Sequence, residues 1–136
     1  MKRIEDLHSI GFIHSDIKFE NILIGKEDPD RIYLIDFGLS RSYENKGLHI
    51  NCEELNVFSG NLLFASFNSC AGSSQSRRDD VESVLYLFLF LLNNCLPWKS
   101  GNYNDSQLKN KLNERAQNKA LYIKKLYKDL NNGIFY

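Results

Sequence analysis

Nine consecutive apolar residues, Val84 to Leu92, constrain this chain more than any other feature of its sequence. Asp79 or Asp80 can cap a helix just before the run, and Pro97 ends it, so one helix is predicted up to about Asn94. A membrane span needs about 20 apolar residues, so a run of nine indicates a buried core segment. Because this helix is apolar on nearly every side, other elements must surround it.

The composition fits a folded domain and excludes some classes of partner. The chain has 136 residues, of which 43% are hydrophobic, and its 17 Lys and Arg balance 17 Asp and Glu. Its length is that of a single domain. Proteins that bind nucleic acids or membrane surfaces over their whole length usually carry a basic excess, so neither partner is expected.

The three cysteines, Cys52, Cys70 and Cys95, are far apart and form no C-x-x-C pair. A disulfide framework and a zinc site remain alternatives, but this spacing favours three small hydrophobic residues in a reducing compartment. The N-terminus has no apolar stretch of the kind found in signal peptides. We therefore expect the protein in the cytoplasm, the nucleus or both.

The first third of the chain predicts a helix end followed by a hairpin. Residues 1–10 are predicted to be the end of a helix that stops at Gly11. Two strands, Ile22–Ile24 and Ile32–Ile35, are separated by a turn rich in aspartate and should pair as an antiparallel hairpin. The second strand is apolar and β-branched enough to be buried.

The rest of the chain predicts loops and helices. Residues 38–76 are rich in Ser, Asn and Gly and predict a long irregular segment. After Pro97, Asp105 or Ser106 can cap a helix that extends to Ala116, and the leucines between 121 and 130 suggest another. The expected fold class is mainly α with one small β-hairpin.

Two motifs flank the predicted hairpin. The first, at 14–21, reads H-S-D-I-K-F-E-N, and the second is D-F-G at 36–38. The hairpin would bring four polar side chains to one end: Asp16, Lys18, Asn21 and Asp36. This set suits phosphoryl transfer, which needs one carboxylate to accept a proton, a lysine to steady the phosphate, and oxygen ligands for Mg²⁺.

Chance explains these motifs poorly. A shuffled chain would contain D-F-G about 0.04 times and H-x-D-x-K-x-x-N about 0.002 times on composition alone. The alternative that Asp16 and Asp36 are ordinary turn residues therefore carries little weight. The order of the motifs around two strands supports the catalytic interpretation further.

At these motifs the chain resembles the eukaryotic protein kinases, which have H-R-D where this sequence has H-S-D at 14–16. The stretches at 75–83 and 96–98 are similar to those of the casein kinase I family. That family also has Ser-Ile-Asn where this chain has Ser-Phe-Asn at 66–68. The likeness extends from about Ile4 to Trp98.

The resemblance implies a truncated, protein-kinase-like C-terminal lobe over residues 1–136. It would contain the catalytic loop, D-F-G, the activation segment and a buried central helix, without an N-terminal lobe. The implied reaction moves the γ-phosphoryl of Mg·ATP to a protein Ser or Thr. The residues that match the family's site are the catalytic Asp16 and Lys18, the magnesium ligands Asn21 and Asp36, and the supporting His14, Gly38 and Asp80. Lys18 would also contact the phosphate. Asp80 would bond the catalytic-loop backbone, with a plain helix cap as the alternative.

The sequence also departs from the family. Ser15 replaces the arginine that would pair with an activation-loop phosphate, so no such switch is expected. Phe19 replaces a proline, which should loosen the catalytic loop, and Asn61 stands where a threonine would bond Asp16. No G-x-G-x-x-G loop is present. We expect this chain alone to be inactive; the alternative is a catalytically dead, kinase-derived binding module or a truncated gene product.

Basic residues gather near the C-terminus. Between Lys109 and Asp129, seven Lys and Arg face two acidic residues, a local charge of 7 − 2 = +5. The segment is interpreted as a solvated face of amphipathic helices, or as a patch for acidic or phospho-primed protein substrates. His8 and His49 lie in no pattern and are interpreted as ordinary surface or helix-end residues.

Overall fold

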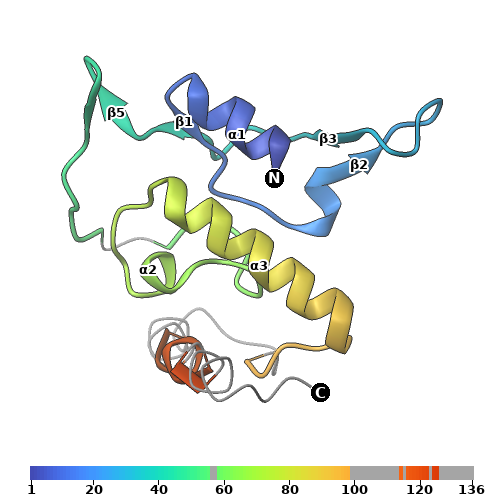
Figure 1. The fold of residues 1–136 in the computed structure, drawn as a ribbon. Helices are drawn as coiled ribbons and strands as arrows, with labels where there is room; N and C mark the ends of the chain where they lie inside the picture. Colours follow the sequence, from blue (N-terminus) through green and yellow to red (C-terminus); the bar gives the residue numbers. More distant parts are fainter. Residues whose placement is uncertain (56–57, 99–113, 115, 123, 126–136) are drawn as a thin grey trace.

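The computed structural model describes residues 1–55, 58–98, 114, 116–122 and 124–125. One helix and a series of short strands form the first part of the chain, and helices follow them (Figure 1). In chain order they are α1 (Lys2–Ser9), β1 (Phe12–Ile13), the 3₁₀ helix η1 (Phe19–Asn21), β2 (Ile22–Ile24), β3 (Ile32–Leu34), β4 (Arg41–Ser42), β5 (Glu44–Asn45), β6 (Leu48–His49), α2 (Phe67–Cys70) and α3 (Arg77–Asn93). Residues 116–122 are also helical.

The predicted hairpin is confirmed, since β2 and β3 pair antiparallel with Ile22 opposite Leu34 and Ile24 opposite Ile32. Two further two-residue pairs, β1–β4 and β5–β6, occur in the described part of the chain, within or beside the segment predicted to be irregular. The predicted burial of the second strand is wrong, because Ile32 and Tyr33 are exposed. The turn of the hairpin extends away from the helices (Figure 1). Ile22 and Leu34 at its base pack against the core, whereas Ile24 and Ile32 next to the turn are exposed.

The helix end predicted at Gly11 is also confirmed. Helix α1 ends at Ser9, and the Gly11 amide donates to the His8 carbonyl. Gly11 has φ +85°, and a Cβ there would lie 2.7 Å from a carboxylate oxygen of Glu44. Glycine suits this position because its backbone is left-handed, and it also leaves room for the end of the Glu44 side chain.

The start of the apolar helix differs from the prediction. The N-cap of α3 is Ser76, not Asp79 or Asp80. Asp79 occupies the third helical position, where its Oδ2 accepts the Ser76 amide at 2.7 Å in a capping box. The helix ends with Asn94 in the left-handed conformation, three residues before Pro97.

Helix α3 buries one side and exposes the other. Val84, Tyr86 and Leu87 pack in a core cluster that also contains Ile4, Ile17, Phe64, Leu96 and Trp98. Phe88 is 53% exposed and Leu92 79% exposed, so the prediction that other elements surround the helix on all sides is wrong for this face. The reason is geometric, since α1 faces only the first turns of α3 (Figure 1). No helix in the described ranges is long and apolar enough to cross a bilayer.

The two faces of α3 should respond differently to substitution. Leu87→Ala is expected to lower the free energy of unfolding by about 2–5 kcal/mol, because it opens a cavity in the core. Leu92→Gln should change it by less than about 0.5 kcal/mol and reduce aggregation, because it removes exposed apolar surface. Urea unfolding and light scattering measure both effects. Equal destabilisation by the two variants would show that Leu92 is buried in solution.

Two other sequence interpretations need correction. None of the three cysteines forms a disulfide, as their spacing favours, but only Cys70 is buried, whereas Cys52 and Cys95 are exposed. Lys119 is not on a solvated basic face: it is fully buried, donates to the Ala65 carbonyl, and lies over the aromatic rings of Tyr86 and Trp98. Most of the segment from 109 to 129, and the predicted cap at 105–106, lie outside the described residues.

Candidate active site

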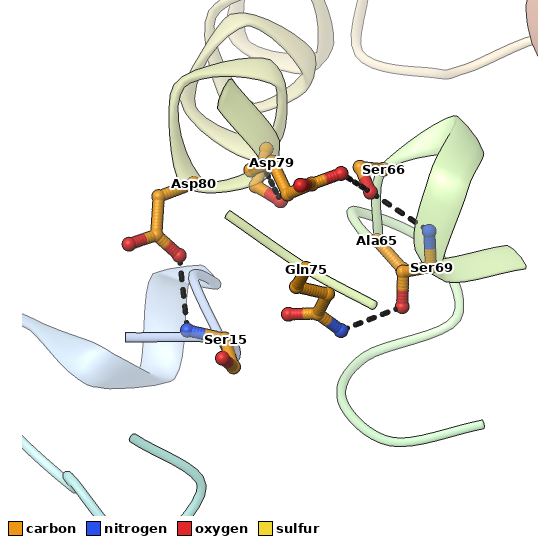
Figure 2. Close-up of a pocket in the computed structure, with 8 residues that line it drawn as sticks. Ser15, Ala65, Ser66, Ser69, Gln75, Asp79 and Asp80 are labelled. Carbon is orange, nitrogen blue, oxygen red and sulfur yellow. Dashed lines mark hydrogen bonds between the residues drawn. The ribbon is translucent and has the colours of Figure 1, made fainter. Parts of the chain in front are cut away.

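The loop at 14–16, which the resemblance to kinases identifies as the catalytic loop, contains a non-glycine residue in the left-handed region. Ser15 has φ +68°, a conformation that costs an L-residue about 1 kcal/mol or more. The loop is held by Asp80 at the start of α3. Its Oδ1 accepts the Ser15 amide at 2.9 Å (Figure 2), and its Oδ2 accepts the His14 amide at 2.8 Å. Because Asp80 is 1% exposed, these bonds are shielded from competing water.

The His14 ring connects the catalytic loop to the D-F-G segment. Its Nδ1 lies 3.3 Å from the Asp16 amide and its Nε2 lies 3.1 Å from the Ile35 carbonyl. Since the Asp16 amide can only donate, Nδ1 is the acceptor and Nε2 carries the proton that is donated to Ile35. The ring also packs against Phe37, with 5.2 Å between centroids. His14 therefore fixes Asp16 relative to the end of β3.

The two oxygens of the Asp16 carboxylate have different surroundings. Oδ2 accepts Lys18 Nζ at 2.5 Å and Asn21 Nδ2 at 3.1 Å. Oδ1 is buried and has no hydrogen-bond partner among the described residues. Gly60, with φ +108°, passes so close that a Cβ there would lie 2.8 Å from the Ser15 carbonyl. An uncommitted oxygen of this kind can accept a proton from a bound hydroxyl.

Lys18 remains charged in the folded protein. The hydrogen bond to Asp16 raises the pKa of Lys18 above its ordinary 10.5, partial burial opposes this, and the charges of Asp16, Glu20 and Asp36 add to the increase. Because the folded-state pKa lies above the unfolded one, the ion pair stabilises the fold below about pH 10.5. This contribution is lost as the pH rises through the folded-state pKa. Lys18 thus offers a fixed positive charge at neutral pH.

Asn21 and Asp36 present oxygens suited to a divalent cation. Asn21 is buried and donates its amide nitrogen to Asp16, so that its Oδ1 accepts no hydrogen bond from the described residues. Its backbone carbonyl accepts the Ile35 amide at 3.0 Å. Asp36 is exposed, and its Oδ1 accepts the Gly38 amide at 3.2 Å. No three His, Cys, Asp or Glu side chains gather into a metal cluster in the part of the chain described. Two hard oxygen ligands fit Mg²⁺, which is commonly held by few protein groups together with phosphates.

His8 lies in the last turn of α1, as the helix-end interpretation expects, but its half-buried side chain also contacts this site. Its Nε2 lies 2.8 Å from Asp80 Oδ2, and its carbonyl accepts the Tyr43 hydroxyl at 2.7 Å. His8 and Asp80 are 72 residues apart. Nothing in the local sequence around His8 signals this partner, so only the packing of α1 against α3 reveals it.

Two departures from the kinase pattern find other roles. Asn61 Oδ1 accepts the amides of Leu63 and Phe64, so this side chain caps its own turn instead of bonding Asp16. Phe19, expected to loosen the loop, packs edge-on against Phe64 at 5.4 Å and tilted against Phe90 at 5.7 Å. It therefore ties η1 to the core.

The comparison with protein families agrees with this geometry, since the model of the "Protein kinase domain" matches residues 1–132. The chain belongs to the protein kinase family. Its relatives include "Casein kinase 1-like protein HD16" of Oryza sativa subsp. japonica, 39% identical over 102 residues, which are 71% of this chain and 14% of the relative. "Casein kinase I homolog 1" of Saccharomyces cerevisiae is 37% identical over 125 residues, which are 88% of this chain and 23% of the relative.

These matches confirm the predicted kind of kinase. The chain is a casein kinase I-like protein kinase by sequence relationship. It spans 14% and 23% of the length of the two relatives. Protein kinases generally transfer phosphate from ATP with the help of Mg²⁺ to protein substrates.

Proposed function

We propose that residues 1–136 form the C-terminal lobe, which carries the catalytic loop, of a serine/threonine kinase of the casein kinase I type. The observation that carries this proposal is the buried Asp16 Oδ1, which has no hydrogen-bond partner in the described part of the chain, beside the fixed charge of Lys18. Neither an ordinary turn aspartate nor a purely structural ion pair would leave one oxygen unsatisfied in this position. The free-energy cost of burying this unsatisfied oxygen is offset when a substrate hydroxyl donates a hydrogen bond to it.

The proposed chemistry assigns one task to each side chain. Asp16 Oδ1 accepts the hydrogen bond, and then the proton, of the attacking Ser or Thr hydroxyl. The Lys18 ammonium balances negative charge that develops on the phosphoryl group. Asn21 Oδ1 and the Asp36 carboxylate would hold Mg²⁺, which when bound neutralises charge on the ATP phosphates.

The substrate class and location are also part of the proposal. The exposed Lys124 and Lys125 favour an acidic or phospho-primed protein substrate, since opposite charges raise the local concentration of such a peptide. The exposed free thiols of Cys52 and Cys95 are compatible with a reducing compartment, and we place the protein in the cytoplasm or nucleus.

Binding without catalysis is the second candidate. The exposed apolar side chains of the hairpin and of α3, among them Ile24 and Leu92, favour it because large exposed apolar surface marks interaction sites. A binding module would need no proton acceptor at Asp16. Activity therefore separates the two candidates.

The decisive experiment compares residues 1–136 alone with a chimera. In the chimera, the part of the yeast relative's kinase domain that precedes the match is joined to residues 1–136. We expect residues 1–136 alone to show no rise in melting temperature with Mg·ATP and no transfer, because its sequence has no Gly-rich loop to cover the phosphates. The chimera should phosphorylate serine in an acidic peptide.

Each arm has an outcome that contradicts its part of the proposal. Transfer by residues 1–136 alone, abolished by Asp36→Ala, would overturn the expected inactivity. A chimera that folds and binds Mg·ATP but transfers no phosphate would overturn the catalytic role and favour the binding module.

A further inference from the structure

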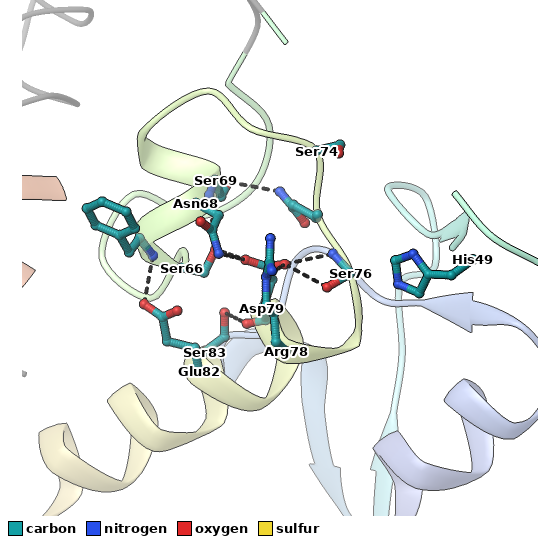
Figure 3. Close-up of polar contacts among 12 residues, drawn as sticks. His49, Ser66, Asn68, Ser69, Ser74, Ser76, Arg78, Asp79, Glu82 and Ser83 are labelled. Atoms are coloured by element: carbon teal, nitrogen blue, oxygen red, sulfur yellow. Dashed lines mark hydrogen bonds and ion pairs between the residues drawn. The ribbon is translucent and has the colours of Figure 1, made fainter. Parts of the chain in front are cut away.

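Asp79 lies at the centre of a buried polar network between α2 and α3 (Figure 3). Its Oδ2 accepts the Ser76 amide at 2.7 Å, which is the capping bond of α3. Its Oδ1 makes a second set of contacts, accepting the Ser66 hydroxyl at 2.5 Å and Asn68 Nδ2 at 3.3 Å. A residue that only capped the helix would need the Oδ2 contacts alone.

The Oδ1 contacts hold the start of α2 in place. Ser66 is the N-cap of α2, and its Oγ accepts the Ser69 amide at 3.0 Å while it donates to Asp79. Glu82, one turn further along α3, accepts the Phe67 amide at 2.7 Å. Two carboxylates of α3 thus fix consecutive residues of α2. Because Ser66 and Asp79 are both almost fully buried, water competes little for these bonds.

The anchored Ser66 lies a short distance along the chain from Gly60, which packs against the loop that carries Asp16. Between Ser66 and Gly60 the chain forms a tight turn, in which the Ala65 amide donates to the Asn61 carbonyl at 2.8 Å. Gly60 then rests on the catalytic loop, where a Cβ would lie 2.8 Å from the Ser15 carbonyl and 3.8 Å from Asp16 Oδ1. Displacement of Ser66 would therefore move the backbone that covers the uncommitted oxygen.

Residues of the Asp79 network also lie next to the catalytic loop across a small cavity. Ser15, Ser66, Asp79 and Asp80 line a small polar cavity, together with residues of α2 and α3 (Figure 2). Asp80 holds the catalytic loop directly, and Asp79 holds the segment that covers it. Asp79 and Asp80, which are adjacent in the first turn of α3, thus set the position of residues 60–66 relative to the loop that carries Asp16.

We propose that Asp79, acting through Ser66 and Asn68, is a positioning residue that fixes residues 60–66 over Asp16 and thereby sets how a substrate hydroxyl reaches Oδ1. The proposal rests on the proposed kinase function for its catalytic consequence. Its structural part, the coupling of α2 to the catalytic loop, stands independently of that function.

The experiment uses a matched pair of serine variants around one carboxylate. Ser66→Ala removes a donor to Asp79 Oδ1, whereas Ser76→Ala removes the N-cap hydroxyl on the Oδ2 side. Amide hydrogen exchange on residues 1–136 reports local opening at each segment. Ser66→Ala should speed exchange at 60–66 and 14–16 at least about fivefold, with the amides of residues 84–90 unchanged. Ser76→Ala should speed exchange only in the first turn of α3.

A catalytic readout separates positioning from general stability. In the chimera, Ser66→Ala should raise the KM for peptide at least about fivefold and leave the KM for ATP unchanged, while Ser76→Ala should change neither. If Ser66→Ala does not fold, Asn68→Ala tests the same Oδ1 side. Unchanged exchange at 14–16 in the folded variant would overturn the proposal. The expected exchange pattern together with an inactive chimera would overturn the kinase function and leave the coupling standing.

Discussion

Asp80→Ala is expected to lower the free energy of unfolding by about 3–5 kcal/mol, because it removes a buried charge-assisted network and leaves its partners unpaired. Asp80 accepts the amides of His14 and Ser15 and contacts the His8 ring. Without it, these amides lose their acceptor, and Ser15 no longer has the bond that offsets its left-handed backbone. Urea denaturation followed by circular dichroism measures the loss.

Two control variants define what the loss means. Asp80→Asn keeps one acceptor oxygen and nearly the same volume, so it should cost less than Asp80→Ala, about 1–3 kcal/mol. Asp30→Ala changes an exposed aspartate in the hairpin turn and should alter stability by less than about 0.5 kcal/mol. If Asp80→Ala costs no more than Asp30→Ala, Asp80 does not hold the catalytic loop in solution.

The elements predicted correctly from the sequence depend on local signals. Gly11 ends α1 because glycine adopts the left-handed backbone at this position without strain. The hairpin follows from two β-branched strands around an aspartate-rich turn. The kinase relationship follows from two short motifs, one at 14–21 and one at 36–38, and each lies within a stretch of at most eight residues. In each case the deciding interaction is close in sequence.

The errors depend on contacts that are distant in sequence. His8 finds its partner 72 residues away, and Lys119 lies under a carbonyl 54 residues away. The helical pattern places Lys119 in a basic segment, but the aromatic rings of Tyr86 and Trp98 provide a cation–π environment that no local pattern predicts. The prediction from apolar sequence also overestimates burial. Ile32 and Leu92 are exposed, because no element among the described residues covers them.

The capping error shows how one residue can fit two local roles. An aspartate before an apolar run is a good N-cap, so the sequence predicts that Asp79 or Asp80 caps the helix. Ser76 takes that position, which places Asp79 at the third helical position and turns Asp80 toward the catalytic loop. The shift of the helix start by three or four residues is what frees both carboxylates for longer-range contacts.

Asp16→Asn in the chimera is expected to lower kcat by about 10²–10⁴-fold, the usual contribution of a positioned general base. The amide cannot take the hydroxyl proton. It also gives up the negative charge that pairs with Lys18, whose Nζ lies 2.5 Å from Asp16 Oδ2. The KM for ATP should change little, since the proposed magnesium ligands are Asn21 and Asp36. Initial rates at varied peptide and ATP concentrations separate these effects.

A lower kcat for Asp16→Asn could come from lost folding stability or from the lost ion pair with Lys18, and these causes must be separated from lost proton transfer. Lys18→Met removes the same ion pair and leaves the carboxylate of Asp16 in place, so it serves as the matched control. If proton acceptance dominates, Asp16→Asn should lower kcat much more than Lys18→Met, because only the Lys18 variant keeps the carboxylate that accepts the proton. A loss below about tenfold for Asp16→Asn, in a chimera whose melting temperature is unchanged, would contradict the assignment of Asp16 Oδ1 as the proton acceptor.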